Sequence, residues 1–220
     1  MLEVTHLTKS FKREIFSNLN FVIPNGAKVH LKGVNGIGKT TLLKIMAGLL
    51  DYEGSISLDG VNQQQDFDTY FQSNAFVAST PLVIDYLTVN EMLNLVENAT
   101  IPSSSTTLNK FKEWKDYYVL KLKLAPYLDE LMLNLSLGTQ QKVALVAALL
   151  SRPKLILLDE PFVNFDRESF YAGLEILEIY VRENDAILIY SSHSHDEEVL
   201  YFADYELIIE NPTALHINQL

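Results

Sequence analysis

The most constraining feature of this sequence is a short glycine-rich loop, GVNGIGKTT, at residues 33–41. A run that predicts a strand at 27–32 precedes it, and apolar residues at helical spacing follow it over 40–50. Glycine at both ends of the loop lets the backbone amides curve inward around a phosphate chain, which a Cβ atom would obstruct. The positive end of the helix dipole points at the same anion. The loop therefore predicts a phosphate-binding site between a strand and a helix.

Two side chains at the end of the loop complete this expected chemistry. Lys39 supplies a point charge for the outer phosphates, and Thr40 supplies a hydroxyl that can ligate Mg²⁺. The alternative is an ordinary glycine-rich turn, which the strand–loop–helix context disfavours. The predicted phosphate-binding residues are Gly33, Asn35, Gly36, Ile37, Gly38, Lys39, Thr40 and Thr41.

A second motif ends in a pair of carboxylates. Four apolar residues at 155–158 predict a buried parallel strand, and Asp159 and Glu160 follow at its carboxyl end. Ligands bind at that edge of α/β sheets. We expect Asp159 to hold Mg²⁺, directly or through water, and Glu160 to polarise the water that attacks a terminal phosphate.

The rest of the chain alternates between strand and helix patterns, which indicates α/β architecture. Strands are expected at 2–7, 20–23, 27–32, 55–58, 76–78, 155–158, 186–190 and 206–210. Helices are expected at 40–50, 139–150 and 167–182.

A mostly helical region spans 88–133, with a loop-like break at 101–105. Within it, Phe111, Trp114 and Tyr118 recur at helical spacing. We interpret them as a stripe that faces the core rather than as a platform for a ligand.

Composition narrows the function classes. The 220 residues are 48% hydrophobic, which is typical of a globular chain with one large domain, with or without an inserted subdomain. The formal net charge of −11 disfavours general binding to nucleic acid and adhesion to an anionic membrane. The absence of cysteine excludes disulfides and thiolate metal sites. The polar N-terminal segment and the short apolar runs predict neither a signal peptide nor a membrane span.

Three further segments follow the order of a known family. Residues 135–142, LSLGTQQK, resemble the signature motif of the ATP-binding subunits of ATP-binding-cassette (ABC) transporters. Residues 159–166, DEPFVNFD, are similar to the stretch that leads to the family's D-loop, and residues 191–193, SSH, to its switch-histidine segment. The resemblance covers nearly the whole chain. It implies a single ABC-type P-loop NTPase domain over 1–220, with a mixed-sheet core, an antiparallel β flank and a helical subdomain inserted at 80–134.

The resemblance also implies roles for single residues. Phe11 matches the aromatic residue that stacks on adenine, and His193 matches the sensor of the γ-phosphate. Asp166 matches the D-loop aspartate. Ser136 and Gly138 match the signature residues that cap the γ-phosphate held by the opposite subunit.

Activity and partners follow from the same resemblance. It implies hydrolysis of ATP with Mg²⁺, in a dimer of two copies or of this chain and a paralogous ATPase. The work would be transport through a separate membrane permease, with the chain on the cytoplasmic face of the cell membrane and no nucleic-acid partner.

Departures from the family pattern fall at two places. Leu137 and Thr139 stand where the signature has glycine and glutamine, and we expect Leu137 to turn toward apolar neighbours so that Ser136 and Gly138 face the nucleotide. Such signatures are similar to those of small exporters that drive ABC-2 permeases. The Q-loop glutamine is missing, and its position falls on Ser79 or Thr80, with Ser79 a possible Mg²⁺ ligand through its hydroxyl.

Two rival functions remain at this stage. One is a soluble ABC ATPase without transport, acting on a translation or DNA-repair complex, which the acidic charge and the short chain disfavour. The other is a nucleotide-dependent binding module that hydrolyses little, which Leu137 and Thr139 favour and which Glu160 and His193 disfavour. Co-purification with a membrane protein and multiple-turnover assays separate the three.

Overall fold

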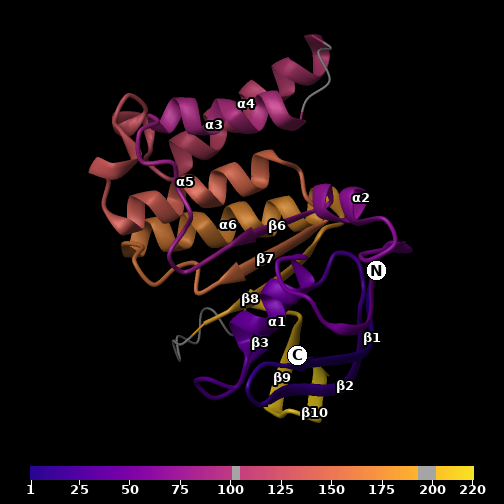
Figure 1. Cartoon of the computed structure of the whole chain (residues 1–220). Coiled ribbons are helices and arrows are strands. Elements are labelled where there is room, and N and C mark those ends of the chain that lie inside the picture. The colour runs from indigo at the N-terminus through magenta and orange to yellow at the C-terminus, as the bar shows by residue number, and fades with distance from the viewer. Residues whose placement is uncertain (101–104, 193–201) are drawn as a thin grey trace. The chain divides into compact units, whose positions relative to one another are not determined.

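A computed structural model describes residues 1–100, 105–192 and 202–220 (Figure 1). The chain divides into two compact units. The first comprises Met1–Phe76, Pro153–Glu160 and Val181–Leu220, and the second comprises Val77–Arg152 and Pro161–Tyr180. The predicted phosphate sensor, His193, lies outside the described residues.

The first unit contains two sheets. A four-stranded antiparallel sheet has the order β2-β1-β4-β5, and a six-stranded sheet has the order β10-β9-β3-β8-β7-β6. In the larger sheet, β3 pairs in parallel with β8 and β9, and β7 pairs in parallel with β8. The strands are β1 (Leu2–Ser10), β2 (Glu14–Ile23), β3 (Lys28–Lys32), β4 (Glu53–Leu58), β5 (Val61–Asn62), β6 (Asn74–Val77), β7 (Leu155–Asp159), β8 (Ile187–Ser191), β9 (Tyr205–Asn211) and β10 (Ala214–Gln219).

Helix α1 (Lys39–Met46) lies in the core that these two sheets share. Its residues Leu42, Leu43, Ile45 and Met46 are fully buried there together with apolar side chains of β1, β2, β3, β7 and β8. This packing fixes the helix that carries the phosphate-loop residues Lys39 and Thr40. The predicted mixed sheet with an antiparallel flank is confirmed.

The second unit is helical. It holds α3 (Val89–Thr100), α4 (Ser105–Lys121), α5 (Leu137–Leu150), most of α6 (Arg167–Asn184) and the short 3₁₀ turns Ala125–Tyr127 and Met132–Asn134. Phe111 and Tyr118 are buried, as the predicted core stripe requires, and the guanidinium of Arg152 lies 3.9 Å from the centre of the Trp114 ring. The proposed subdomain at 80–134 falls within this unit. None of the described helices has the length and apolar character that a bilayer span requires.

Several boundaries differ from the predictions for local reasons. The helix predicted at 40–50 ends at Met46. Strand β2 begins at Glu14, whereas the sequence predicted a start at 20. The prediction began too late because polar residues occupy the exposed face in this part of the strand. Helix α2 (Phe67–Gln72) was not predicted, because its six residues lack a clear apolar period, and the Asp66 carboxylate accepts a bond from the Thr69 amide at its start. Strand β10 was also missed, since it is a polar strand at the sheet edge.

Candidate functional site: a phosphate loop and a signature helix

The phosphate loop joins β3 to α1. Gly38 precedes the helix with φ 117°, and a Cβ atom there would lie 2.8 Å from Cζ of Phe16, so the loop needs glycine for both conformation and space. The Lys39 side chain is 8% exposed, and its Nζ donates to the carbonyl oxygen of Gly33 at 2.7 Å. The ammonium therefore lies against the backbone of the loop that is predicted to wrap the phosphates.

Asp159 connects this loop to the end of β7. Its Oδ2 accepts from Thr40 Oγ1 at 2.7 Å, and its Oδ1 accepts from Ser191 Oγ at 2.7 Å. Asp159 is buried. The two hydroxyls that donate to it hold its carboxylate in one orientation. The structure thus brings together Thr40 and Asp159, two of the residues that the sequence predicted as Mg²⁺ ligands.

The donor set fits magnesium. Hydroxyl and carboxylate oxygens are the hard ligands that Mg²⁺ prefers, and this ion is usually held by one or two carboxylates, substrate phosphates and waters. In the part of the chain that the structure describes, no cluster of three or more His, Cys, Asp or Glu residues could hold a metal ion alone. A site built from Thr40 and Asp159 therefore suits an ion that arrives with a nucleotide.

Ser191 is a residue whose role the sequence did not reveal. Its hydroxyl donates to Asp159 and also accepts from the backbone N–H of Glu160 at 3.1 Å. The side chain is fully buried at the end of β8, directly opposite Asp159 in the parallel ladder. The contact between Ser191 and Asp159 depends on the register of β7 and β8, which the sequence alone does not give.

Glu160 has a left-handed backbone, with φ 54°. That conformation costs about 1–3 kcal/mol for a residue with a side chain and persists only where the surroundings impose it. Here the hydrogen bond to Ser191 is one such constraint. The strain falls on the residue that the sequence singled out as the general base.

His30 lies on β3 beside the same edge. Its Nε2 is 2.9 Å from Ser192 Oγ, and its ring stacks on Tyr190 at 5.1 Å between centroids. Burial, with help from the Lys32 ammonium, lowers the pKa of His30 from 6.5 to about 4. The imidazole is therefore neutral near pH 7.

Phe11 occupies the turn between β1 and β2 and is 58% exposed. Phe11 is therefore not a core residue. On β2, the rings and methyls of Ile15 and Phe16 surround the place that a Cβ atom of Gly38 would take. The hairpin that carries Phe11 thus packs against the phosphate loop.

The signature segment lies at the start of α5, in the second unit. Ser136 is the N-cap of the helix, and its Oγ accepts from the Thr139 amide at 3.2 Å. Leu137 is 40% exposed, and its turn toward apolar neighbours stays a prediction.

Gly138 is buried, unlike Ser136. A Cβ atom at this position would lie 2.2 Å from the carbonyl oxygen of Asn164. The glycine therefore allows close approach of two backbones within the second unit.

Asp166 is the N-cap of α6. Its carboxylate accepts from the amide and the hydroxyl of Ser169 at 2.9 and 2.6 Å, and from Lys142 Nζ on α5 at 2.8 Å. The hydrogen bond from Lys142, followed by those from Ser169, holds the pKa of Asp166 well below its usual value. This predicted D-loop residue is tied to the signature helix through Lys142.

Ser79, one of the two positions on which the missing glutamine falls, contacts a different glutamine. Gln141 is buried in α5 and donates from Nε2 to the backbone oxygen of Ser79 at 2.6 Å. Its Oε1 accepts from Asn164 Nδ2 at 3.3 Å. The sequence did not predict this bridge, because the polar run after the signature gave no specific signal for it.

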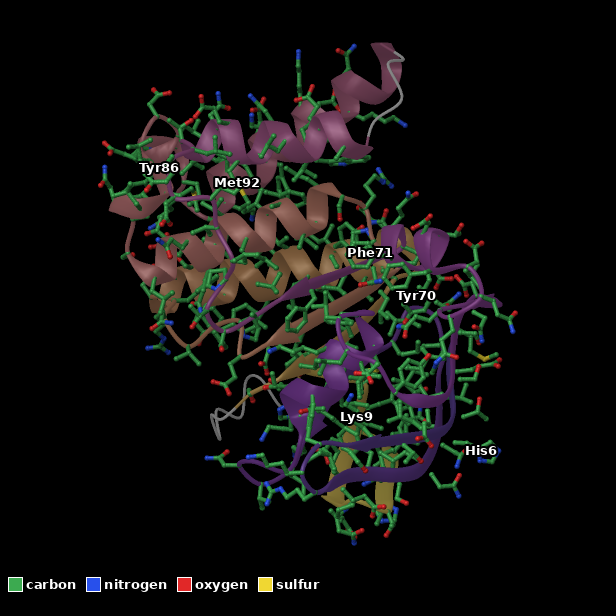
Figure 2. All side chains as sticks on the ribbon, viewed as in Figure 1. His6, Lys9, Tyr70, Phe71, Tyr86 and Met92 are labelled. Carbon is green, nitrogen blue, oxygen red and sulfur yellow. The ribbon has the colours of Figure 1, made fainter. Side chains whose placement is uncertain are left out.

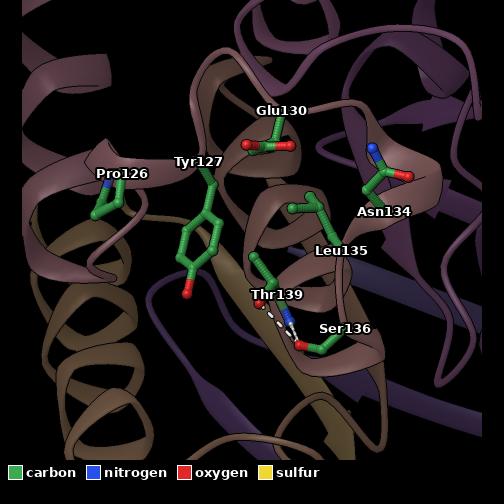
Figure 3. A pocket seen from close by; sticks show the side chains of 7 residues that line it. All are labelled: Pro126, Tyr127, Glu130, Asn134, Leu135, Ser136 and Thr139. Carbon is green, nitrogen blue, oxygen red and sulfur yellow. Dashed lines mark hydrogen bonds between the residues drawn. The ribbon is translucent and has the colours of Figure 1, made fainter.

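A pocket of about 230 Å³ opens beside the signature serine (Figure 3). The side chains of Tyr127 and Glu130 enter it from the segment before the signature, and Ser136 and Thr139 form its floor. Its remaining lining residues are Pro126, Asn134 and Leu135. The start of α5 therefore borders a hollow that is lined by both polar and apolar side chains.

Comparison with known proteins agrees with these observations. The pattern that defines the family described as "ABC transporter" matches residues 16–163. The chain is 34% identical over 202 residues to the zinc uptake system ATP-binding protein ZurA of Listeria monocytogenes, covering 88% of this chain and 76% of that protein. It is 31% identical to the cytochrome c biogenesis ATP-binding export protein CcmA of Legionella pneumophila, covering 94% and 98%. A solved structure of the ATP-binding subunit of an ABC transporter superposes with a TM-score of 0.90 at 27% identity, covering 100% of this chain and 90% of that one.

The fold and the phosphate loop define a P-loop ATPase of the cassette type. The chain belongs to the ABC transporter family. Within it the chain is an ATP-binding subunit, whose class hydrolyses ATP and powers transport.

Proposed function

We propose that this chain binds Mg-ATP with its phosphates on residues 33–41 and hydrolyses it to ADP and phosphate. The observation that carries the proposal is the pair of hydroxyl bonds to Asp159, from Thr40 on the phosphate-loop helix and from Ser191 on β8. They bring a lysine-bearing loop, a carboxylate and a neighbouring glutamate to one edge of the parallel sheet. Together these groups support phosphoryl transfer to water.

The individual roles follow from charge and position. Lys39 and the amides at the start of α1 neutralise the phosphate oxygens. Thr40 and Asp159 hold Mg²⁺, which supplies charge neutralisation of the phosphates when bound. Glu160 orients the attacking water and accepts its proton as the water oxygen bonds the γ-phosphorus and the bond to ADP breaks; Glu160 then releases the proton to solvent.

The second half of the site comes from another subunit in this proposal. Ser136 is exposed at the N-terminus of α5, where free amides favour an anion. We place Ser136 and Gly138 against the phosphate held by the opposite subunit, with Asp166 nearby at the subunit contact. His193 would sense the γ-phosphate, and Ser79 would be a further Mg²⁺ contact.

The cellular setting is part of the same proposal. The chain would dock on the cytoplasmic side of a membrane permease and drive its conformational cycle. Its acidic charge supports a protein partner rather than a nucleic acid.

Two variants test the proposal together. Glu160→Gln keeps hydrogen bonding but loses the charge, so kcat should fall about 10²- to 10⁴-fold while ATP still binds. An ATP-dependent dimer should then accumulate on size exclusion. Lys39→Ala should instead abolish most ATP binding in calorimetry and prevent the dimer.

Either of two results would contradict the proposal. Full turnover by Glu160→Gln would assign the general base elsewhere. Equal ATP affinity of Lys39→Ala and the parent would show that the loop does not bind the phosphates.

A further inference from the structure

Lys9 is a buried cation that the proposed mechanism does not use. It lies on β1, where Leu2, Val4 and Leu7 are the other buried positions, and its side chain is 6% exposed. Lysine is almost never so buried unless its ammonium is paired. The position of this charge therefore needs a specific explanation (Figure 2).

Asp51 holds the ammonium in place. Nζ of Lys9 donates to the backbone oxygen of Asp51 at 2.6 Å and to its Oδ1 at 2.7 Å. The Asp51 carboxylate is exposed, so this ion pair contributes little to stability. The two hydrogen bonds to Asp51 hold the Lys9 ammonium in a fixed position relative to the segment that follows α1.

The fixed ammonium lies over an aromatic ring. Nζ of Lys9 is 4.8 Å from the centroid of Phe11, within the range of a cation–π contact. Lys9 also pairs across the hairpin with Phe16, the residue whose ring touches the position of Gly38. One lysine thus connects the exposed aromatic ring of the hairpin with the strand that packs on the phosphate loop.

We propose that Lys9 is a positioning residue for the nucleotide base: its ammonium, anchored by Asp51, supports one face of Phe11 so that the other face stacks on adenine. This inference rests on the proposed function, in which Phe11 is the adenine platform. The ring is then held in place before the nucleotide arrives, which lowers the entropy lost on binding. The cation also draws electron density from the ring, which favours stacking on an electron-rich purine.

The experiment compares two ligands that share phosphates but not the base. Binding of Mg-ATP and of Mg²⁺ with inorganic tripolyphosphate is measured by calorimetry for the parent, Lys9→Met, Lys9→Arg and Phe11→Ala. Lys9→Met should weaken ATP binding about 3- to 10-fold and leave tripolyphosphate binding unchanged. Lys9→Arg keeps a cation that can lie over the ring and should restore most of the ATP affinity.

The matched control is Lys12→Met, which removes an exposed lysine from the same hairpin. It should leave the affinities for both ligands within twofold of the parent. This control separates the fixed cation from a general loss of positive charge near the phosphates. Thermal unfolding of every variant reports whether the hairpin is still folded.

Each outcome decides between the inference and the function on which it rests. If Phe11→Ala weakens only ATP binding and Lys9→Met changes nothing, the inference is overturned and the adenine platform stands. Equal weakening of both ligands by Lys9→Met also overturns it, because the lysine would then act on the phosphate loop. If Phe11→Ala leaves ATP binding unchanged, the adenine platform itself is wrong.

Discussion

The phosphate loop and the signature segment differ in how much of their polar structure is complete within one chain. Around the loop, Thr40, Asp159, Ser191 and the Glu160 amide are joined by hydrogen bonds inside the first unit. In the signature segment, the Ser136 hydroxyl bonds to the amide and the hydroxyl of Thr139 in its own helix, and Ser136 remains exposed.

The comparison teaches that the two motifs meet different demands. The phosphate loop must hold charged groups in a fixed geometry before the nucleotide binds, so its groups are buried and paired. The signature segment must meet a separate surface, so its functional side chain faces outward. Within the segment Gly138 and Gln141 are buried, and Gly138 lets α5 approach Asn164.

The largest effect on stability is expected at Gly138, a buried position of the signature segment. Gly138→Ala forces a methyl against the Asn164 carbonyl, which should lower the free energy of unfolding by about 3 kcal/mol. Chemical denaturation measures this, with Leu137→Ala as the matched control on the exposed face of the same turn, expected within about 0.5 kcal/mol of the parent. Equal stability of the two variants would show that the signature segment is as adaptable at Gly138 as at Leu137.

A smaller effect on stability tests whether the buried hydrogen bonds around Asp159 matter to the phosphate site. Ser191→Ala removes the hydrogen bond that Ser191 donates to Asp159 and the one that it accepts from the Glu160 N–H, so the free energy of unfolding should fall by about 2 kcal/mol. The Mg²⁺ concentration that supports half-maximal ATP hydrolysis should also rise, because the carboxylate is less well oriented. Ser192→Ala is the control, since its hydroxyl contacts His30 rather than Asp159. An unchanged Mg²⁺ dependence in Ser191→Ala would show that Thr40 alone orients Asp159.

The smallest effect is a pH dependence near the phosphate site. The pKa of His30 is about 4 in the folded chain and about 6.5 when unfolded, so the unfolded state binds more protons between these values. Stability should therefore fall as the pH drops below 6.5, by at most about 1.4 kcal/mol per pH unit from this residue. The Lys32 ammonium lowers the pKa of His30 further, and the Glu206 carboxylate raises it.

Unfolding at pH 7.0 and 5.5 checks this prediction. His30→Gln keeps an amide that can reach Ser192 but cannot titrate, so its stability should depend less on pH than that of the parent. Identical pH dependence of the two proteins would mean that the imidazole is protonated in the folded state as readily as in the unfolded one.

Much of the phosphate site could be predicted from sequence. The glycines, Lys39 and Thr40 are neighbours in the chain, and Asp159 and Glu160 end a run of four apolar residues. Such signals depend on conformational preference and periodicity over a few residues. The core positions of Phe111 and Tyr118 followed from the same reasoning.

What the sequence by itself determined is the set of local motifs and, through their order, the family and the α/β class. What only the tertiary structure decided is which distant groups meet. Ser191 reaches Asp159 because β7 and β8 pair in parallel with these residues opposite each other. Gly138 is buried because Asn164 passes over it, and Lys9 supports Phe11 because Asp51 anchors its ammonium. The physical reason is that register and close packing depend on atoms far apart in the chain, which no spacing along the sequence records.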